Sequence, residues 1–436
     1  MINRSIYQEL EEWKKESGRK PLLIRGARQV GKSYIVEEFG KTEFSNHISV
    51  NFERNPEYKE IFTSFNPIDI IEKISLFTGK QIQFGKTLLF LDEIQECPEA
   101  ITALRYFYEE MPELHIIGAG SLLEFALKTK GFKMPVGRIQ YLYMQPLGFS
   151  EFLNAFGENT LNEYISRYEN LQEIPENLHN KLIELVRKYF VVGGMPAVVN
   201  EYISSRDIIK CQRIQRSIID TYTDDFGKYS SRSKLPFLQK VFYASASMVG
   251  EKFVYAKVDK QIKSRELKEA VELLETAGIL TRIKRTNGAG IPLEANVKSG
   301  FFKMLFLDVG LLHNISGIKG ESIVAKDLAT IFNGAVAEQF TGQELLVSQN
   351  PYRKPSLFYW AREAKNSNAE VDYLLEYQGD IIPVEVKSGT SGRMKSMIMF
   401  MNQFDSEKGL KISQSQYSEN DKIISLPFYG ISALFN

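Results

Sequence analysis

The sequence predicts an α/β protein of several domains, and three observations support this. Residues 1–150 alternate apolar, strand-like runs with helical patterns, which predicts a mostly parallel sheet covered by helices on both faces. Residues 316–436 return to helix and strand after a long helical stretch. A chain of 436 residues is also too long for one hydrophobic core, so about two to four domains are expected.

The elements follow one another in four stretches. In residues 1–150 the strand-like runs are PLLIRG, HISVNF, TLLFLD and HIIGAGS, which begin at residues 21, 47, 87 and 115. Residues 151–232 have a helical pattern, interrupted by GGMP at 193–196. Residues 233–315 predict a helix, a strand over FVYAKV at 253–258, a helix over 264–278 and a strand over LTRIKR at 280–285. Residues 316–436 predict a helix that carries Glu338, followed by the strands SLFYWA, AEVDYLLEY and IIPVEVKS.

Composition limits the classes of function. The chain has 54 basic and 54 acidic residues, which argues against a surface coated in positive charge for non-specific nucleic-acid binding. Its two cysteines, Cys97 and Cys211, lie far apart and lack the spacing of a zinc site, as expected in a reducing cytoplasm. Because no apolar run approaches the roughly 18 residues that a membrane span needs, we expect a cytoplasmic protein without a membrane partner.

The clearest motif lies between an apolar strand and a helix. Residues 26–33 fit the pattern G-x-x-x-x-G-K-[ST] in full, with the residues Gly26, Ala27, Arg28, Gln29, Val30, Gly31, Lys32 and Ser33. The glycines let backbone N–H groups turn toward a phosphate, and the helix that follows adds its own free N–H groups. Lys32 is expected to reach the β- and γ-phosphates, and Ser33 to ligate Mg²⁺. The motif therefore predicts ATP and Mg²⁺ as cofactors.

A second apolar strand supplies carboxylates for the same site. Residues 87–92 end on Asp92 and are followed by Glu93, at the carboxyl end of a strand, where ligands of α/β sheets bind. Asp92 is expected to hold Mg²⁺ through water, and Glu93 to orient and polarise the attacking water. Together with residues 26–33, this pair predicts hydrolysis of the bound nucleotide.

Two further polar residues have open interpretations. Ser121, at the end of the strand between the two motif strands, is either a sensor of the γ-phosphate or a cap of the helix that follows. Arg138 is either an arginine finger that acts across a subunit contact or a solvated, salt-bridged side chain.

Several segments together resemble a large prokaryotic group of AAA-type ATPases, relatives of the archaeal-type and STAND-like P-loop ATPases. They are RKPLLIRGARQVGKS, TLLFLDEIQ, the GR before QPLGFSEFL, YFVVGGMPAVV and FLDVGLL. The resemblance implies ATP binding by Gly26, Gly31, Lys32 and Ser33, with Asp92 and Glu93 in hydrolysis. It also implies a winged-helix segment after the ATPase and a nuclease-like fold at the end. Ser33 departs from the group, in which threonine is more usual, but either hydroxyl can ligate Mg²⁺.

The expected architecture is thus an α/β P-loop NTPase with a parallel sheet, a helical lid, a winged-helix segment and a C-terminal nuclease-like α/β domain. The boundaries are 1–150 for the ATPase core, 151–232 for the helical lid or linker, 233–315 for the winged-helix-like segment and 316–436 for the nuclease-like domain. In the third segment, the exposed face of helix 264–278 carries glutamates that would repel phosphate. Contact with DNA and packing against protein are both open for this segment.

The C-terminal domain carries a second candidate site. Asp372 lies on one predicted strand, and Glu385 and Lys387 share one face of the next, because residues i and i+2 of a strand point the same way. Two carboxylates and a lysine resemble the site of PD-(D/E)XK nucleases. Asp372 and Glu385 would bind Mg²⁺, Lys387 would hold the attacking water, and Glu338 would be an additional ligand or supporting group. The same fold can also serve as an inert binding platform.

Two functions follow from this sequence. The first is an ATPase whose nucleotide state changes the arrangement of a winged-helix and a nuclease-like module that acts on DNA. The alternative is an ATP-dependent molecular switch that binds a protein partner, or a second copy of itself, through an inert nuclease-like domain.

Overall fold

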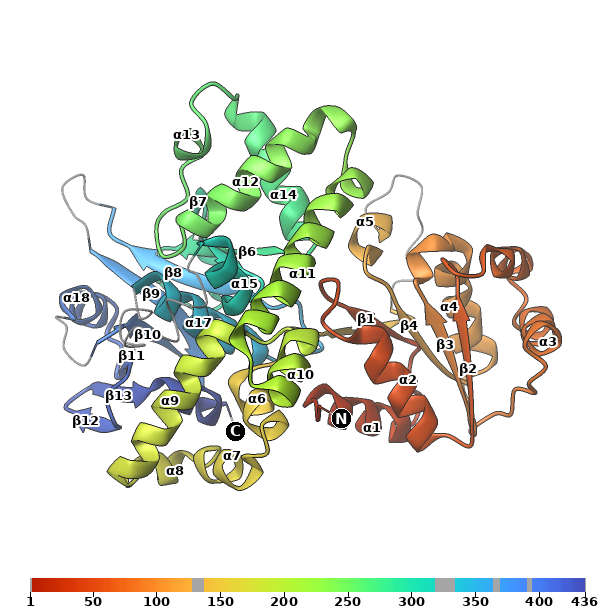
Figure 1. The fold of residues 1–436 in the computed structure, drawn as a ribbon, viewed down its shortest axis with the longest axis horizontal. Helices are drawn as coiled ribbons and strands as arrows, with labels where there is room; N and C mark the ends of the chain where they lie inside the picture. Colours follow the sequence, from red (N-terminus) through yellow and green to blue (C-terminus); the bar gives the residue numbers. More distant parts are fainter. Residues whose placement is uncertain (1, 128–136, 318–333, 364–368, 390–393, 436) are drawn as a thin grey trace.

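The computed structural model describes residues 2–127, 137–317, 334–363, 369–389 and 394–435. Figure 1 shows the N-terminal α/β unit, coloured red to orange, on one side of the molecule and the yellow-to-blue remainder on the other. Helix α11 (Ile208–Tyr229) runs between them. The P-loop and the C-terminal strands therefore belong to neighbouring parts of one molecule.

The N-terminal unit is built on a five-stranded sheet in the order β2-β3-β4-β1-β5, and each pairing is parallel. The strands are β1 Leu22–Arg25, β2 Asn46–Asn51, β3 Thr87–Asp92, β4 His115–Ala119 and β5 Gln140–Tyr143. This confirms the predicted α/β fold with a parallel sheet. Strand β4 lies between β1 and β3, so the segment that ends at Ser121 does separate the two motif strands.

Both faces of this sheet are buried, which explains why its strands are continuously apolar. Leu22 and Ile24 belong to one apolar core, and Leu23 belongs to the core on the other face. The first core continues through Tyr189 and Phe340 into the rest of the molecule. The helices around the sheet are α1 Ile6–Lys15, α2 Lys32–Glu43, α3 Pro67–Thr78, α4 Pro98–Glu110 and α5 Leu123–Leu127, with short 3₁₀ helices at Pro56–Ser64 and Ile94–Glu96.

The middle of the chain is helical, as predicted for residues 151–232. Its helices are α6 Phe149–Ala155, α7 Asn159–Ile165, α8 Tyr168–Leu171, α9 Glu176–Val192, α10 Pro196–Ser205, α11, α12 Leu235–Ser247, α13 Tyr255–Val258, α14 Ser264–Thr276 and α15 Val309–Ile315, with a 3₁₀ turn at Arg232–Lys234.

The strand predicted at 253–258 is wrong: Lys252 makes an isolated bridge to Lys303, and α13 follows as one helical turn. None of the described helices has the length and apolar character to cross a membrane.

A second sheet has eight strands in the order β12-β13-β11-β10-β9-β8-β6-β7. They are β6 Leu280–Thr286, β7 Val297–Phe306, β8 Leu357–Ala361, β9 Glu370–Tyr377, β10 Asp380–Val386, β11 Gly409–Ser413, β12 Ser418–Asn420 and β13 Ile423–Pro427. Helices α17 Gly334–Val347 and α18 Lys395–Phe404 and 3₁₀ helices at Leu293–Asn296 and Phe428–Leu434 accompany it. Because β6 pairs in parallel with β8, the hairpin of the predicted winged-helix segment shares one sheet with the C-terminal strands, across the boundary predicted at 315.

Candidate functional site

The loop between β1 and α2 has the backbone that its glycines predict. Gly26 has φ 148° and Gly31 has φ 99°, in the region that favours glycine. A Cβ on Gly26 would overlap the carbonyl oxygen of Met144 after β5. Gln29 adopts φ 61° without being a glycine. Helix α2 begins at Lys32, so its free N–H groups open into the loop.

Lys32 is held inside this loop. Its side chain is only 6% exposed, and Nζ donates to the carbonyl oxygens of Gly26 at 2.9 Å and Ala27 at 2.7 Å. Burial lowers the pKa of Lys32 to about 8, although the charges of Glu93 and Asp92 act in the opposite direction. A buried ammonium group with neutral partners is well suited to receive a polyphosphate anion.

The two halves of the predicted site meet at one hydrogen bond. Ser33 Oγ donates to Asp92 Oδ1 at 2.8 Å, and Asn51 Nδ2 donates to Asp92 Oδ2 at 2.9 Å. Burial raises the pKa of Asp92. Hydroxyl and carboxylate oxygens are the ligands that Mg²⁺ prefers, so Ser33 and Asp92 fit the ion that the motif predicts. Sequence reasoning missed Asn51, which lies opposite Asp92 at the carboxyl end of β2.

Glu93 lies next to Ser121, at the carboxyl ends of β3 and β4. Glu93 adopts φ 49°, which turns the chain sharply after β3. Its Oε2 accepts from Gln95 Nε2 at 2.7 Å and from Ser121 Oγ at 3.2 Å. The Ser121 hydroxyl in turn accepts from Arg28 Nε of the P-loop at 3.0 Å. Ser121 therefore connects the loop to the carboxylate that is expected to orient water.

Two side chains of helix α11 contact Arg28 of the P-loop. Arg28 Nη1 forms an ion pair with the buried carboxylate of Asp225, and Tyr222 Oη donates to the carbonyl oxygen of Arg28 at 2.7 Å. Near the N-terminus, Arg4 Nη1 donates to the carbonyl oxygen of Val30 at 3.0 Å. Sequence reasoning missed Asp225, Tyr222 and Arg4 because each acts over a long separation in the chain.

Arg138 lies at an exposed ion pair. Its Nε is 2.8 Å from Glu109 Oε1, and 43% of its side chain is exposed. This environment agrees with the second interpretation of Arg138, a solvated, salt-bridged side chain. A finger role would need a second copy of the chain, so it stays a prediction.

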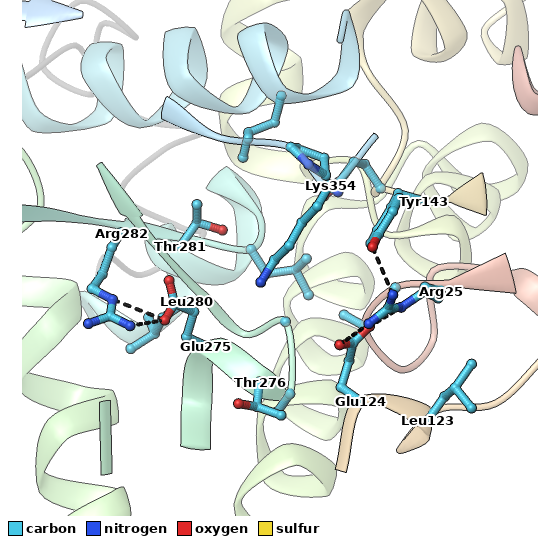
Figure 2. A pocket seen from close by; sticks show the side chains of 18 of the residues that line it. Arg25, Leu123, Glu124, Tyr143, Glu275, Thr276, Leu280, Thr281, Arg282 and Lys354 are labelled. Carbon is cyan, nitrogen blue, oxygen red and sulfur yellow. Dashed lines mark hydrogen bonds and ion pairs between the residues drawn. The ribbon is translucent and has the colours of Figure 1, made fainter. Parts of the chain in front are cut away.

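A pocket of about 180 Å³ lies beside the start of the P-loop. Figure 2 shows its polar side chains: Arg25 pairs with Glu124 and donates to Tyr143 Oη at 2.9 Å, and Lys354 reaches in from the C-terminal half. The turn between α14 and β6 closes the pocket. A Cβ on Gly278 in this turn would lie 3.3 Å from that of Ala27. The C-terminal half therefore contacts the P-loop directly.

Three of the segments that carry the family resemblance outside the loop meet in a buried network. Leu147 N donates to the carbonyl oxygen of Gly194 at 2.8 Å, and Gly194 N donates to Asp308 Oδ2 at 2.6 Å. Tyr189 Oη donates to the carbonyl oxygen of Leu147, and Gln343 Nε2 donates to Tyr189 Oη at 2.8 Å. These segments thus join the helical region to the C-terminal sheet.

The structure also brings together the residues predicted in the C-terminal domain. Asp372 of β9 accepts from the backbone N of Val386 at 2.8 Å, and Lys387 Nζ is 2.6 Å from Glu385 Oε1. Burial, and next the charge of Asp372, raise the pKa of Glu338 to about 8 and of Glu385 to about 7. In the described part of the chain, no group of three or more His, Cys, Asp and Glu side chains is arranged to hold a metal ion.

Lys303 of β7 belongs to the same cluster, and sequence reasoning missed it. Its Nζ is 2.6 Å from Glu370 Oε1, 3.4 Å from Glu338 Oε2 and 3.6 Å from Asp372 Oδ1. Burial acts to lower the pKa of Lys303, but the charges of these carboxylates outweigh it and raise the pKa. The only available signal was an isolated lysine in an otherwise apolar strand end, KMLF.

The parallel sheet, the glycine loop with its buried lysine and the Ser33–Asp92 contact define the class of P-loop domains. Residues 18–153 match the family described as an AAA domain, which supports an AAA-type P-loop domain in the N-terminal unit. Residues 183–322 and 333–429 match two families described as domains of unknown function, DUF8612 and DUF4143. No curated protein matches this sequence.

Three solved structures are among those to which the chain is similar. A Walker-type ATPase of Pyrococcus abyssi is 17% identical, with 72% of this chain and 96% of that chain covered and a TM-score of 0.46. The ORC2 protein of Aeropyrum pernix, in ADPNP–ADP complexes, is 12% identical, with 74% and 96% covered and a TM-score of 0.36. The AMPPCP-bound DnaA of Aquifex aeolicus is 13% identical, with 63% and 88% covered and a TM-score of 0.26.

Proposed function

We propose that this chain is a cytoplasmic protein that binds ATP with Mg²⁺ on residues 26–33 and hydrolyses it. The observation that carries the proposal is the 2.8 Å hydrogen bond from Ser33 Oγ to Asp92 Oδ1, which joins the two halves of the motif. When bound, Mg²⁺ would neutralise charge on the β- and γ-phosphate oxygens. The chain supplies Ser33 directly and Asp92 through water to hold the ion.

Three side chains would carry the remaining steps. Lys32 exchanges the carbonyl oxygens of Gly26 and Ala27 for phosphate oxygens. Glu93 orients the attacking water and polarises it. Ser121, which touches both Glu93 and Arg28, is placed to link the γ-phosphate to the orientation of Glu93.

A pair of variants tests this proposal. Glu93→Gln should keep ATP binding and lose turnover, because the amide cannot accept a proton from water. Lys32→Ala should lose binding itself. Glu96→Gln is the matched control, since Glu96 is an exposed partner of Lys59 near the same strand. Normal turnover by Glu93→Gln would remove the assigned role of Glu93.

We also propose that nucleotide state is transmitted to the C-terminal half. Two contacts support this: the ion pair of Arg28 with Asp225 on α11, and the close packing of Ala27 against Gly278 before β6. A phosphate that draws the loop amides inward must move Ala27 and Arg28, and both are fixed to elements outside the ATPase unit. Coupling of this kind needs contacts that differ between two states.

The first candidate for what this coupling controls is action on DNA. Its support is that Asp372 lies on β9, Glu385 on the adjacent β10 and Lys387 directly after β10, the arrangement that the nuclease resemblance implies. The experiment is a nicking assay on single- and double-stranded DNA with Mg²⁺ or Mn²⁺ and ATP. Cleavage that is lost in Glu385→Ala and Lys387→Ala would establish this function.

The second candidate is a switch that binds a protein partner and cleaves nothing. Its support is that two of the basic side chains near α14 already have acidic partners: Arg282 pairs with Glu275, and Lys284 with Glu294 at 2.6 Å. Phosphates would have to compete with these carboxylates. If no combination of DNA, metal ion and nucleotide gives cutting, this candidate stands.

We also propose that copies of the chain associate and that Arg138 of one copy acts as an arginine finger on the nucleotide of another. Arg138→Ala should lower ATPase activity only where copies of the chain associate, because a finger acts on the nucleotide of a neighbour. An unchanged rate in a confirmed oligomer would rule out the finger role.

A further inference from the structure

The C-terminal acidic cluster contains a buried cation that the chain itself supplies. The side chain of Lys303, a residue of β7, lies over the ring of Tyr359, with Nζ 5.6 Å from the ring centroid. It is 1% exposed and ends among Glu338 of α17 and Glu370 and Asp372 of β9, at 2.6 to 3.6 Å. The ammonium group therefore lies where carboxylates from two different elements converge.

The charges of the cluster are almost balanced without any added ion. Four carboxylates and three ammonium groups of the described chain take part in its ion pairs: Glu338, Glu370, Asp372 and Glu385 with Lys252, Lys303 and Lys387. Even when all of these groups are counted as ionised, a divalent ion would turn the slight negative excess into a positive one. It would also lie within a few ångströms of a buried ammonium, where charges of the same sign are poorly screened.

The oxygens that a metal would need are largely engaged. Asp372 Oδ2 accepts from Val386 N at 2.8 Å, and Oδ1 is 3.6 Å from Lys303 Nζ. Glu385 Oε1 accepts from Lys387. Glu385 Oε2 is buried without a hydrogen-bond partner in the described part of the chain. A divalent ion at these oxygens would have to displace the contacts of Lys303 and Lys387 and lie beside a buried ammonium group.

We propose that Lys303 replaces the divalent ion of this cluster, so that the nuclease-like domain holds a tethered ammonium group instead of a metal. Lys303 then joins β7 to α17 and β9 and fixes the hairpin β6–β7 to the C-terminal sheet. Of the two functions proposed above, this inference selects the second, a switch that cleaves nothing. This inference concerns the C-terminal cluster alone and does not depend on ATP hydrolysis.

The test counts Mn²⁺ ions bound to the full chain without nucleotide, from the free Mn²⁺ signal in paramagnetic resonance. The wild type and Asp372→Asn should bind the same number of ions. Lys303→Met should bind one more ion than the wild type, and Lys303→Met combined with Asp372→Asn should lose it again. Lys303→Arg, which keeps the charge, should gain none.

Two results would overturn the proposal. One is a wild type that binds one ion more than Asp372→Asn does, because the metal would then share the cluster with Lys303. The other is a folded Lys303→Met variant that gains no ion. If Lys303→Met fails to fold, the comparison of the wild type with Asp372→Asn decides the question alone, and the P-loop site contributes equally to both.

Discussion

Arg28 of the P-loop forms an ion pair with Asp225 of α11, across 197 positions of the chain. Asp225 is 6% exposed, and the carbonyl oxygen of Arg28 accepts a hydrogen bond from Tyr222, one turn earlier on the same helix. The phosphate-binding loop is therefore fixed at a side chain and at the backbone by a helix outside the ATPase unit. This contact gives a direct route by which a bound nucleotide can be sensed beyond the parallel sheet.

Asp225→Asn should lower the free energy of unfolding by about 3 kcal/mol, because it removes one partner of a buried ion pair and leaves Arg28 uncompensated. Urea unfolding measures this. Asp220→Asn is the matched control on the same helix: Asp220 pairs with Arg216, and its side chain is 51% exposed. We expect Asp220→Asn to lower the free energy of unfolding by less than about 0.5 kcal/mol. Equal losses in the two variants would contradict a special role for Asp225.

Ser33→Ala should weaken binding of Mg·ATP by about tenfold and leave binding of ATP in EDTA almost unchanged, because the hydroxyl acts on the ion rather than on the phosphates. Fluorescent-nucleotide titrations with and without Mg²⁺ measure both affinities. Ser45→Ala, at an exposed position before β2, is the control. The same loss of affinity with and without Mg²⁺ would show that Ser33 holds the loop and not the ion.

ATP affinity should depend on pH through Lys32. Burial lowers the pKa of Lys32 to about 8 in the free protein, and a bound polyphosphate raises it again. Because Lys32 has the higher pKa in the ATP-bound state, the affinity for ATP is at its full value below pH 8. It should fall by up to about tenfold per pH unit above that. Titrations at pH 7, 8 and 9 measure this, and a flat profile would contradict the ion pair.

Gly194→Ala should destabilise the fold by about 3 kcal/mol, because the added Cβ would overlap the carbonyl oxygen of Leu147 in the buried network. Gly227→Ala in α11 meets open space, and should stabilise the protein by about 0.5 to 1 kcal/mol. Thermal unfolding of the two variants provides the comparison. A stable Gly194→Ala variant would show that the GGMP segment is not tightly packed.

The nucleotide half of the site could be predicted because its signals are local. Each of these signals spans only a few residues: the glycines at 26 and 31, the lysine after them, and the acid at the end of an apolar strand. The run of apolar residues in β1 and β3 likewise indicates strands buried on both faces.

The contacts that join the parts could not be predicted, because their partners lie far apart in the chain. Asp225 and Lys303 are ordinary charged residues in sequence, and only the fold brings them to Arg28 and Glu370. The strand expected at 253–258 failed for a related reason. Its aromatic and β-branched residues suit a strand. The pairing, however, stops at the bridge of Lys252 to Lys303 and the hydrogen bond from Phe253 N to the carbonyl oxygen of Phe302, and the chain then forms the turn α13.

The most direct test of ATP binding is calorimetric titration of the full chain with ATP and Mg²⁺, beside Lys32→Ala. We expect saturable heat in the wild type, competition by ADP, and at least about 30-fold weaker binding in the variant, because a charge-assisted phosphate contact is lost. A wild type that releases no heat and shows no competition by ADP, or a variant that binds as tightly as the wild type, would contradict the assignment of residues 26–33 as the phosphate-binding loop.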